Sequence, residues 1–243
     1  MIATFTPATK TPLTFEQAAE ALRAALASTM TARPTDDVLA LALAKSAFET
    51  ARWKSIWCHN FGNVKAGDTY VGMFCAFACG ENLKDGVHWF EPDGTDKNLT
   101  KGTITGKGTY EVPPGHPQTR FRAYANQFDG AFSYVDLVAG GYYAQAWKAL
   151  LTGDARAFVH QLKAKGYFTG PEEAYASGVI SLQKEFAAKL KGMSPEPADV
   201  DWGAAQASVR SLNHWDGLTM KLYAGLDLSH RRGDSEEDGK AVS

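Results

Sequence analysis

Apolar positions along the chain change their spacing twice, and these changes divide the sequence into parts. In residues 14–66 and 127–190, apolar side chains recur at three- and four-residue steps, which is typical of helices that bury one face. In residues 67–118 that period is lost, and glycines interrupt short runs such as GVHWF, which indicates β-hairpins. The pattern predicts a predominantly helical α+β fold in which a bundle carries a β-hairpin lobe.

Capping residues and glycines set the bounds of the expected helices. Thr14 and Gln17 form a capping box before a helix over 15–28, and Thr35 begins a second helix, whose first acids suit its positive end. Four further helices are expected at 128–139, 142–151, 154–165 and 171–190. Within the lobe, we expect 96–107 to be a mobile loop and 112–117 an extended return to the bundle.

The 243 residues suffice for one sizeable domain with a real core. Residues 1–13, with two prolines, are predicted to be a flexible leader, and 14–190 the domain itself. Residues 191–243 are expected to be a linker and an appendage, which could dock with a partner and whose polar end is predicted to be disordered.

Charge and hydropathy exclude some classes of partner. The net charge of −2 gives no reason to expect nucleic acid, which requires a concentrated basic surface. Binding to anionic polymers is not excluded, because local lysines such as Lys97, Lys101 and Lys107 can attract them without a positive net charge. No apolar run approaches the roughly 20 residues of a membrane span, and the N-terminal segment shows no signal peptide.

The three cysteines, Cys58, Cys75 and Cys79, are too few for a disulfide-stapled scaffold. Together with His59 and His88 they do not match a zinc-finger spacing, so we expect no metal and no other cofactor. A Cys58–Cys75 or a Cys75–Cys79 bridge stays open for an oxidising compartment.

A single carboxylate, Glu49, ends the second expected helix. If Phe48, Trp53 and Trp57 surround it, the loss of hydration raises its pKa, whereas a nearby Arg52 would lower it. A carboxylic acid that keeps its proton near neutral pH can protonate a leaving oxygen. The same pattern also fits an exposed glutamate on a solvated helix face.

Three stretches follow one another in a characteristic order: AFET with NFGNVKA (47–66), TRFRAY (119–124) and GYFTGPEEAYA (166–176). Together they resemble the signature of the lysozyme-like glucosaminidases of glycoside hydrolase family 73, the flagellar and autolysin-type peptidoglycan hydrolases. The resemblance covers about residues 15–190. It implies a lysozyme-like fold with a substrate cleft between bundle and lobe, and action on the glycan strand of peptidoglycan.

The resemblance also implies roles for individual residues. Glu49 becomes the acid that protonates a β-1,4 bond between N-acetylglucosamine and N-acetylmuramic acid. Glycosidases usually need a second carboxylate, for which Glu81 on the lobe is favoured and Asp68 is the other possibility. Tyr167 and Tyr175 match two tyrosines of the family motif, with Tyr167 expected to act in catalysis and Tyr175 to bind substrate.

Further residues are candidates for binding sugar. Asn60 and Phe61 would form the floor of the cleft, the amide for acetamido groups and the ring for stacking, while Trp57 and Trp89 could pack against sugar faces. The chain departs from the family motif at Phe168 and Gly170, which stand where alanine and aspartate are usual. Three alternatives therefore stay open: a catalytically silent wall-binding or particle module, a lytic transglycosylase, and a zinc-dependent amidase or peptidase. Without a visible signal peptide, delivery to the wall would require a phage particle, a holin or a dedicated secretion system.

Overall fold

The computed structural model describes residues 3–30, 32–67, 69–107 and 116–193. Helices predominate over two small sheets, so the α+β fold expected from the apolar pattern is confirmed. From residue 194 onward, the predicted appendage lies outside the described residues, as does part of the expected return at 112–117.

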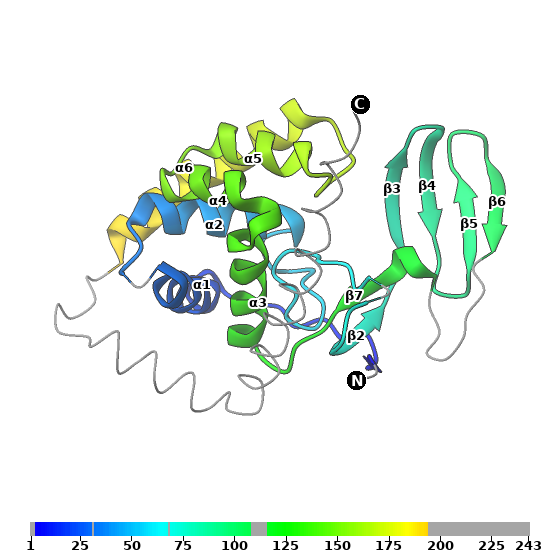
Figure 1. Cartoon of the computed structure of the whole chain (residues 1–243), viewed down its shortest axis with the longest axis horizontal. Coiled ribbons are helices and arrows are strands. Elements are labelled where there is room, and N and C mark those ends of the chain that lie inside the picture. Colours follow the sequence, from blue (N-terminus) through cyan, green and yellow to red (C-terminus); the bar gives the residue numbers. More distant parts are fainter. Residues whose placement is uncertain (1–2, 31, 68, 108–115, 194–243) are drawn as a thin grey trace, which may run out of the picture. The chain divides into compact units, whose positions relative to one another are not determined.

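The expected helices are present, with bounds close to the predicted ones (Figure 1). They are α1 (Phe15–Met30), α2 (Asp36–Glu49), α3 (Gln127–Ala139), α4 (Ala144–Leu151), α5 (Ala155–Ala164) and α6 (Glu172–Gly192), with short 3-10 turns η1 (Pro117–Thr119) and η2 (Gly141–Tyr143). The capping box before α1 is formed: Thr14 N donates to Gln17 Oε1 at 2.9 Å, and Gln17 N to Thr14 Oγ1 at 3.2 Å.

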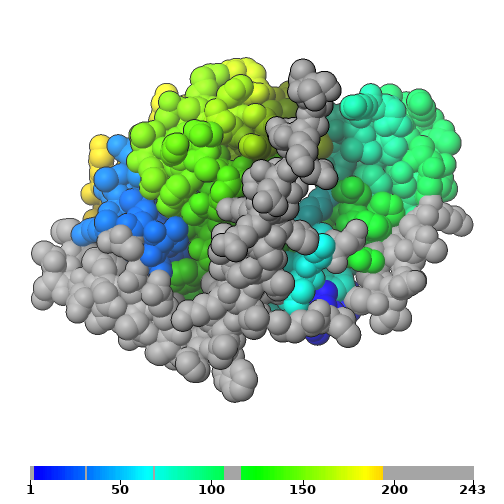
Figure 2. All heavy atoms as spheres, viewed as in Figure 1, coloured from blue at the N-terminus to red at the C-terminus, as the bar shows by residue number. Residues whose placement is uncertain are grey.

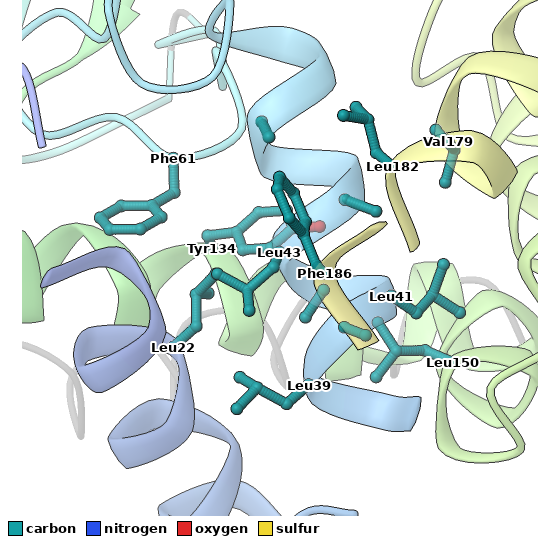
Figure 3. Packing of buried hydrophobic residues seen from close by; sticks show 14 of the residues in the cluster. Leu22, Leu39, Leu41, Leu43, Phe61, Tyr134, Leu150, Val179, Leu182 and Phe186 are labelled. Carbon is teal, nitrogen blue, oxygen red and sulfur yellow. The ribbon is translucent and has the colours of Figure 1, made fainter. Parts of the chain in front are cut away.

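Helix α2 lies at the centre of the core. Leu39 and Leu43 lie on one side of the helix and Leu41 on the other, and all three are at most 1% exposed, so α2 is surrounded rather than packed on one face (Figure 3). Each fully buried leucine contributes about 1.5–3 kcal/mol of transfer free energy. Since Glu49 is the last residue of α2, the most deeply packed helix positions it.

Helices α2 and α6 approach closely through a glycine. A Cβ placed on Gly178 would lie 2.2 Å from the ring of Phe48, so this ring lies directly against the backbone of α6. Tyr175 precedes Gly178 by three residues and therefore shares its helix face. The glycine thus brings Tyr175 next to the end of α2.

The predicted β-rich lobe contains a four-stranded antiparallel sheet built from consecutive hairpins (Figure 1), whose surface runs from cyan to green in Figure 2. Its strands are β3 (Cys79–Leu83), β4 (Gly86–Phe90), β5 (Thr95–Asn98) and β6 (Thr103–Lys107). The expectation of a mobile loop over 96–107 is wrong, because β5 and β6 pair as a hairpin, with Asn98 opposite Thr103. Asp96 and Asn98 of β5 both make hydrogen bonds to His88 on the neighbouring strand β4.

A smaller sheet joins the N-terminal segment to the domain. Strand β1 (Thr4–Phe5) pairs in parallel with β2 (Met73–Ala76), which pairs antiparallel with β7 (Arg120–Arg122). Thr11 N also donates to Ile56 O at 2.9 Å. Residues 1–13 were expected to form a flexible leader. From Thr4 onward they are instead held by backbone hydrogen bonds to the rest of the domain. The two prolines in this segment gave no sign of this pairing.

Candidate active site

The chain leaves α2 through an unusual turn. Ala51, Arg52 and Trp53 all adopt left-handed backbone conformations, with φ of 50°, 57° and 59°. Such a conformation costs a residue with a Cβ roughly 1–2 kcal/mol. The turn reverses the chain, so that the loop over residues 60–66 returns beside Glu49. Asn63 Nδ2 donates to the Glu49 backbone carbonyl at 2.5 Å.

The carboxylate of Glu49 is 17% exposed and is held by side chains from two helices. Its Oε1 accepts a hydrogen bond from the hydroxyl of Tyr175 on α6 and lies 3.6 Å from Lys45 Nζ, one turn earlier on α2. The negative end of the α2 dipole disfavours a negative charge at this position, whereas the ammonium favours it. Opposing electrostatic influences therefore meet at a single, mostly buried carboxylate.

The aromatic environment expected around Glu49 differs from the observed one. Trp53 is a core residue: its indole donates to Ser46 Oγ at 3.1 Å and stacks on Phe186 with ring centroids 5.5 Å apart. Trp57 stacks on Phe77 at 5.2 Å, with Lys10 near its ring. The expected position of Trp53 is corrected, because its buried contacts lie on the core side of the turn.

Arg52 is paired elsewhere. Its guanidinium makes a bidentate contact with Glu185 on α6, at 2.7 and 2.6 Å. This hydrogen bonding raises the pKa of Arg52 and lowers the pKa of Glu185 to about 2. The possibility that Arg52 counters the charge of Glu49 is therefore not realised; Lys45 occupies that role.

Three tyrosines lie around the site, namely the buried Tyr134 and Tyr175 and the partly buried Tyr167. Burial raises the pKa of each phenol, and the negative charge of Glu49 raises it further, so all three phenols keep their protons. Tyr175 donates to Glu49, and Tyr167 donates to the Gly62 carbonyl at 2.9 Å. A Cβ on Gly62 would lie 2.5 Å from the Tyr167 hydroxyl, so only glycine fits this loop position.

The structure corrects the roles expected for Asn60 and Phe61. The Asn60 amide is 1% exposed and used internally: it donates to Val64 O and Arg122 O and accepts from Val64 N, all at 2.8–2.9 Å. Phe61 is fully buried in the core near Tyr134 (Figure 3). Neither side chain is available to a sugar, and both instead fix the loop that carries Asn63.

The second candidate carboxylate, Glu81, joins the lobe to two loops of the bundle. Its Oε1 pairs with Lys65 Nζ at 2.5 Å, and its Oε2 accepts from Thr169 Oγ1 at 3.3 Å. Asn82 N also donates to Thr169 Oγ1, at 3.1 Å. Glu81 is thus an ion-pair partner here, and the alternative candidate, Asp68, lies outside the described residues.

These contacts bring together stretches that are far apart in the sequence. The loop over residues 60–66 contacts α2 through Asn63, the strand β7 through Asn60, and Tyr167 through Gly62. The motifs therefore converge on the end of α2. The substrate cleft expected between bundle and lobe stays a prediction.

Sequence reasoning missed Lys45 and Tyr134. Lys45 lies in an apolar helical run four residues before Glu49, and this spacing places both side chains on one helix face. That signal was available and could have identified the pair. Tyr134 carried no comparable signal, because one tyrosine in an apolar helix is indistinguishable from ordinary core.

The described part of the chain contains neither a cluster of metal-ligating side chains nor a helix that could span a membrane. Within residues 3–193, apart from the gaps given above, no three His, Cys, Asp or Glu side chains are arranged to hold a metal ion. All three cysteines are free thiols, with Cys58 and Cys75 buried. Over the same residues, none of the helices has the length and apolar character needed to cross a membrane.

Comparisons with known proteins return structures only. No family model and no curated protein matches the chain. Three solved structures are similar. A mutant peptidoglycan hydrolase from Sphingomonas sp. A1 is 21% identical, with a TM-score of 0.46 over 74% of this chain and 96% of that chain. The hydrolase itself is 20% identical, with a TM-score of 0.41 over 77% and 95%.

The third structure is a C-terminally truncated glycoside hydrolase domain of Salmonella typhimurium FlgJ. It is 20% identical, with a TM-score of 0.39 over 73% of this chain and 99% of that chain. Because the identities are near 20% and the TM-scores below 0.5, we base the function on the site itself.

Proposed function

We propose that this chain is a glycoside hydrolase that cleaves a β-1,4 bond between N-acetylglucosamine and N-acetylmuramic acid in the peptidoglycan strand. One observation carries the proposal: a single, mostly buried carboxylate at the end of α2, oriented by Tyr175 and set where the resembling motifs converge. General acid catalysis requires a carboxyl group held in this way, partly desolvated and fixed in direction.

The contacts of Glu49 indicate which oxygen delivers the proton. Oε1 accepts from the Tyr175 hydroxyl and faces the Lys45 ammonium, so the catalytic proton is carried on Oε2. In the proposed step the Oε2–H bond breaks, the proton joins the glycosidic oxygen, and the bond from that oxygen to the anomeric carbon breaks. The departing sugar leaves as an alcohol, and Glu49 is left ionised beside a cation.

The attacking group is less constrained. Glu81 could serve as base only after separating from Lys65 and Thr169. Its pairing favours routes that need no second carboxylate, namely attack by the substrate's own acetamido group or by the muramic hydroxyl. The second route would make the enzyme a lytic transglycosylase. Mass spectrometry of released fragments separates them, since hydrolysis leaves reducing ends and the transglycosylase route leaves anhydro ends.

The variant Glu49→Gln tests the proposal. The amide keeps the size of the side chain and an acceptor for Tyr175, but it carries no acidic proton. We expect clearing of purified peptidoglycan to slow by about 10²- to 10⁴-fold, the usual contribution of a general acid. Glu185→Gln on α6 is the matched control, because that glutamate pairs with Arg52 away from the site. It should clear at the wild-type rate.

Two outcomes would contradict the proposal. Equal clearing by wild type and Glu49→Gln would remove Glu49 from the mechanism. No clearing by either protein, with binding to the wall retained, would favour the silent wall-binding module.

A further inference from the structure

Lys45 is a buried cation at the candidate active site that the proposed reaction does not use. Its side chain is fully buried, and its Nζ lies 3.6 Å from the centre of the Tyr167 ring and 5.1 Å from that of Tyr134. Glu49 Oε1, at 3.6 Å, is just beyond hydrogen-bond length. Within the described residues, this ammonium makes no hydrogen bond.

Such a position is unfavourable for a lysine that serves only packing. A buried ammonium loses its hydration, and apolar side chains of similar volume are often equally or more stabilising. Burial lowers the pKa of Lys45 to about 8, while the charge of Glu49 opposes this shift, so the cation persists at neutral pH. The two tyrosine faces offset part of the lost hydration through cation–π contact.

We propose that Lys45 is a positioning residue for the acid: its ammonium, enclosed by Tyr167 and Tyr134, holds Oε1 inward, and its charge sets the pH dependence of the proposed reaction. This inference rests on the proposed function. It also gives Tyr167 a place in the site, as the ring on which the cation rests, although the Tyr167 hydroxyl is already engaged with Gly62.

The direction of the effect follows from charge. A cation within about 4 Å favours the ionised form of a carboxyl group. A general acid works in its protonated form, so activity falls as pH rises and the acid ionises. With Lys45 present, this fall should therefore occur at lower pH than it would without the cation.

Two variants of the full chain test this inference, Lys45→Met and Lys45→Gln. Both remove the charge, one with an apolar and one with a polar side chain, and thermal unfolding identifies the folded variants. Initial rates of peptidoglycan clearing are measured from about pH 4 to 9. We expect the alkaline limb of both profiles to move upward by about 1–3 pH units, the usual effect of one opposite charge.

Lys189→Met is the matched control. Its ammonium pairs with Glu185 on α6 at 3.1 Å, so its removal should leave the pH profile unchanged. The wild-type limb in either folded Lys45 variant, or equal movement in Lys189→Met, would overturn the positioning role while leaving the proposed function intact. Absence of clearing by the wild-type chain would overturn the proposed function and this inference together.

Discussion

The helical bundle and the four-stranded lobe bury different kinds of side chain. Around α2 the core is leucine and alanine, with Leu41 and Leu43 fully buried. In the lobe, the buried residues include His88 and Asn98, while apolar Ile104 is 56% exposed. Apolar burial, which is non-directional, thus dominates in the bundle, whereas directional hydrogen bonds among polar and ionisable side chains are buried in the lobe.

This difference bears on where the two carboxylates lie. Glu49 ends the helix with the most apolar surroundings, whereas Glu81 lies on an edge strand that contacts the bundle through Lys65 and Thr169. Regions with few buried apolar contacts open at lower free energy than a packed core. Glu49 is therefore positioned by the region expected to resist local unfolding most, whereas Glu81 lies in the region expected to open at lower free energy.

The largest expected effect is on the apolar side of this contrast. Leu41→Ala should lower the free energy of unfolding by about 2–5 kcal/mol, because it leaves a cavity beside α2. Ile104→Ala in the lobe should change it by no more than about 0.5 kcal/mol. Denaturant titration of both variants measures the difference, and losses of similar size would show that the two regions are stabilised alike.

A smaller effect, of opposite sign, is expected for Lys45→Met. Burial lowers the pKa of Lys45 from 10.5 to about 8, so the unfolded chain binds more protons between these values and stability rises with pH across them. At about 1.4 kcal/mol per pKa unit, a fall of about 2.5 units means that the buried lysine costs about 3.5 kcal/mol at neutral pH. The variant should therefore be more stable than wild type at pH ~7, with the advantage shrinking above pH ~8. A less stable variant at neutral pH would contradict this assignment.

The smallest expected effect is a pH dependence confined to the lobe. His88 lies between two carboxylates: its Nδ1 is 2.8 Å from Asp96 Oδ1 and its Nε2 is 2.9 Å from Asp85 Oδ1. The hydrogen bond to Asp96 raises the pKa of His88 most, and the one to Asp85 raises it further, against the opposing effect of burial. A raised histidine pKa stabilises the folded state below about pH 6.5 and loses this contribution as pH rises through the folded value.

Hydrogen exchange, corrected for its intrinsic pH dependence, measures this contribution. Amides of β4 and β5 should be better protected near pH ~5.5 than near pH ~8, whereas α2 amides provide the internal control. In His88→Gln the dependence should disappear from the lobe. The same pH dependence in α2 and the lobe, or its persistence in the variant, would contradict the role of His88.

The same contrast explains which elements could be predicted from sequence. The helices were predictable because a buried helical face leaves a three- and four-residue period. The hairpin β5–β6 was not, because Asp96 and Asn98 fill its inner side and mimic the composition of a loop. A strand that buries polar groups lacks the alternation on which strand prediction depends.

At the site, residue types were more predictable than their contacts. Glu49 and Tyr175 were identified separately, but sequence did not show that they touch, since the contact depends on the α2–α6 approach. Asn60 and Phe61 were assigned to sugar binding because amides and aromatic rings suit that task. In the structure both side chains are buried, and the Asn60 amide is hydrogen-bonded to the backbone. Composition reveals what a side chain can do, and burial decides whether it is free to do it.

The approach of α6 to Phe48 has a consequence for engineering this molecule. Because the Phe48 ring lies where a Cβ on Gly178 would be, the contact between this ring and the backbone of α6 depends on the absence of one methyl group. Adding that group would force the Phe48 ring to shift, and this ring is 39% exposed and packs on Tyr175 with ring centroids 4.5 Å apart. A substitution at Gly178 would therefore reach the Tyr175–Glu49 hydrogen bond through Phe48, without changing either partner.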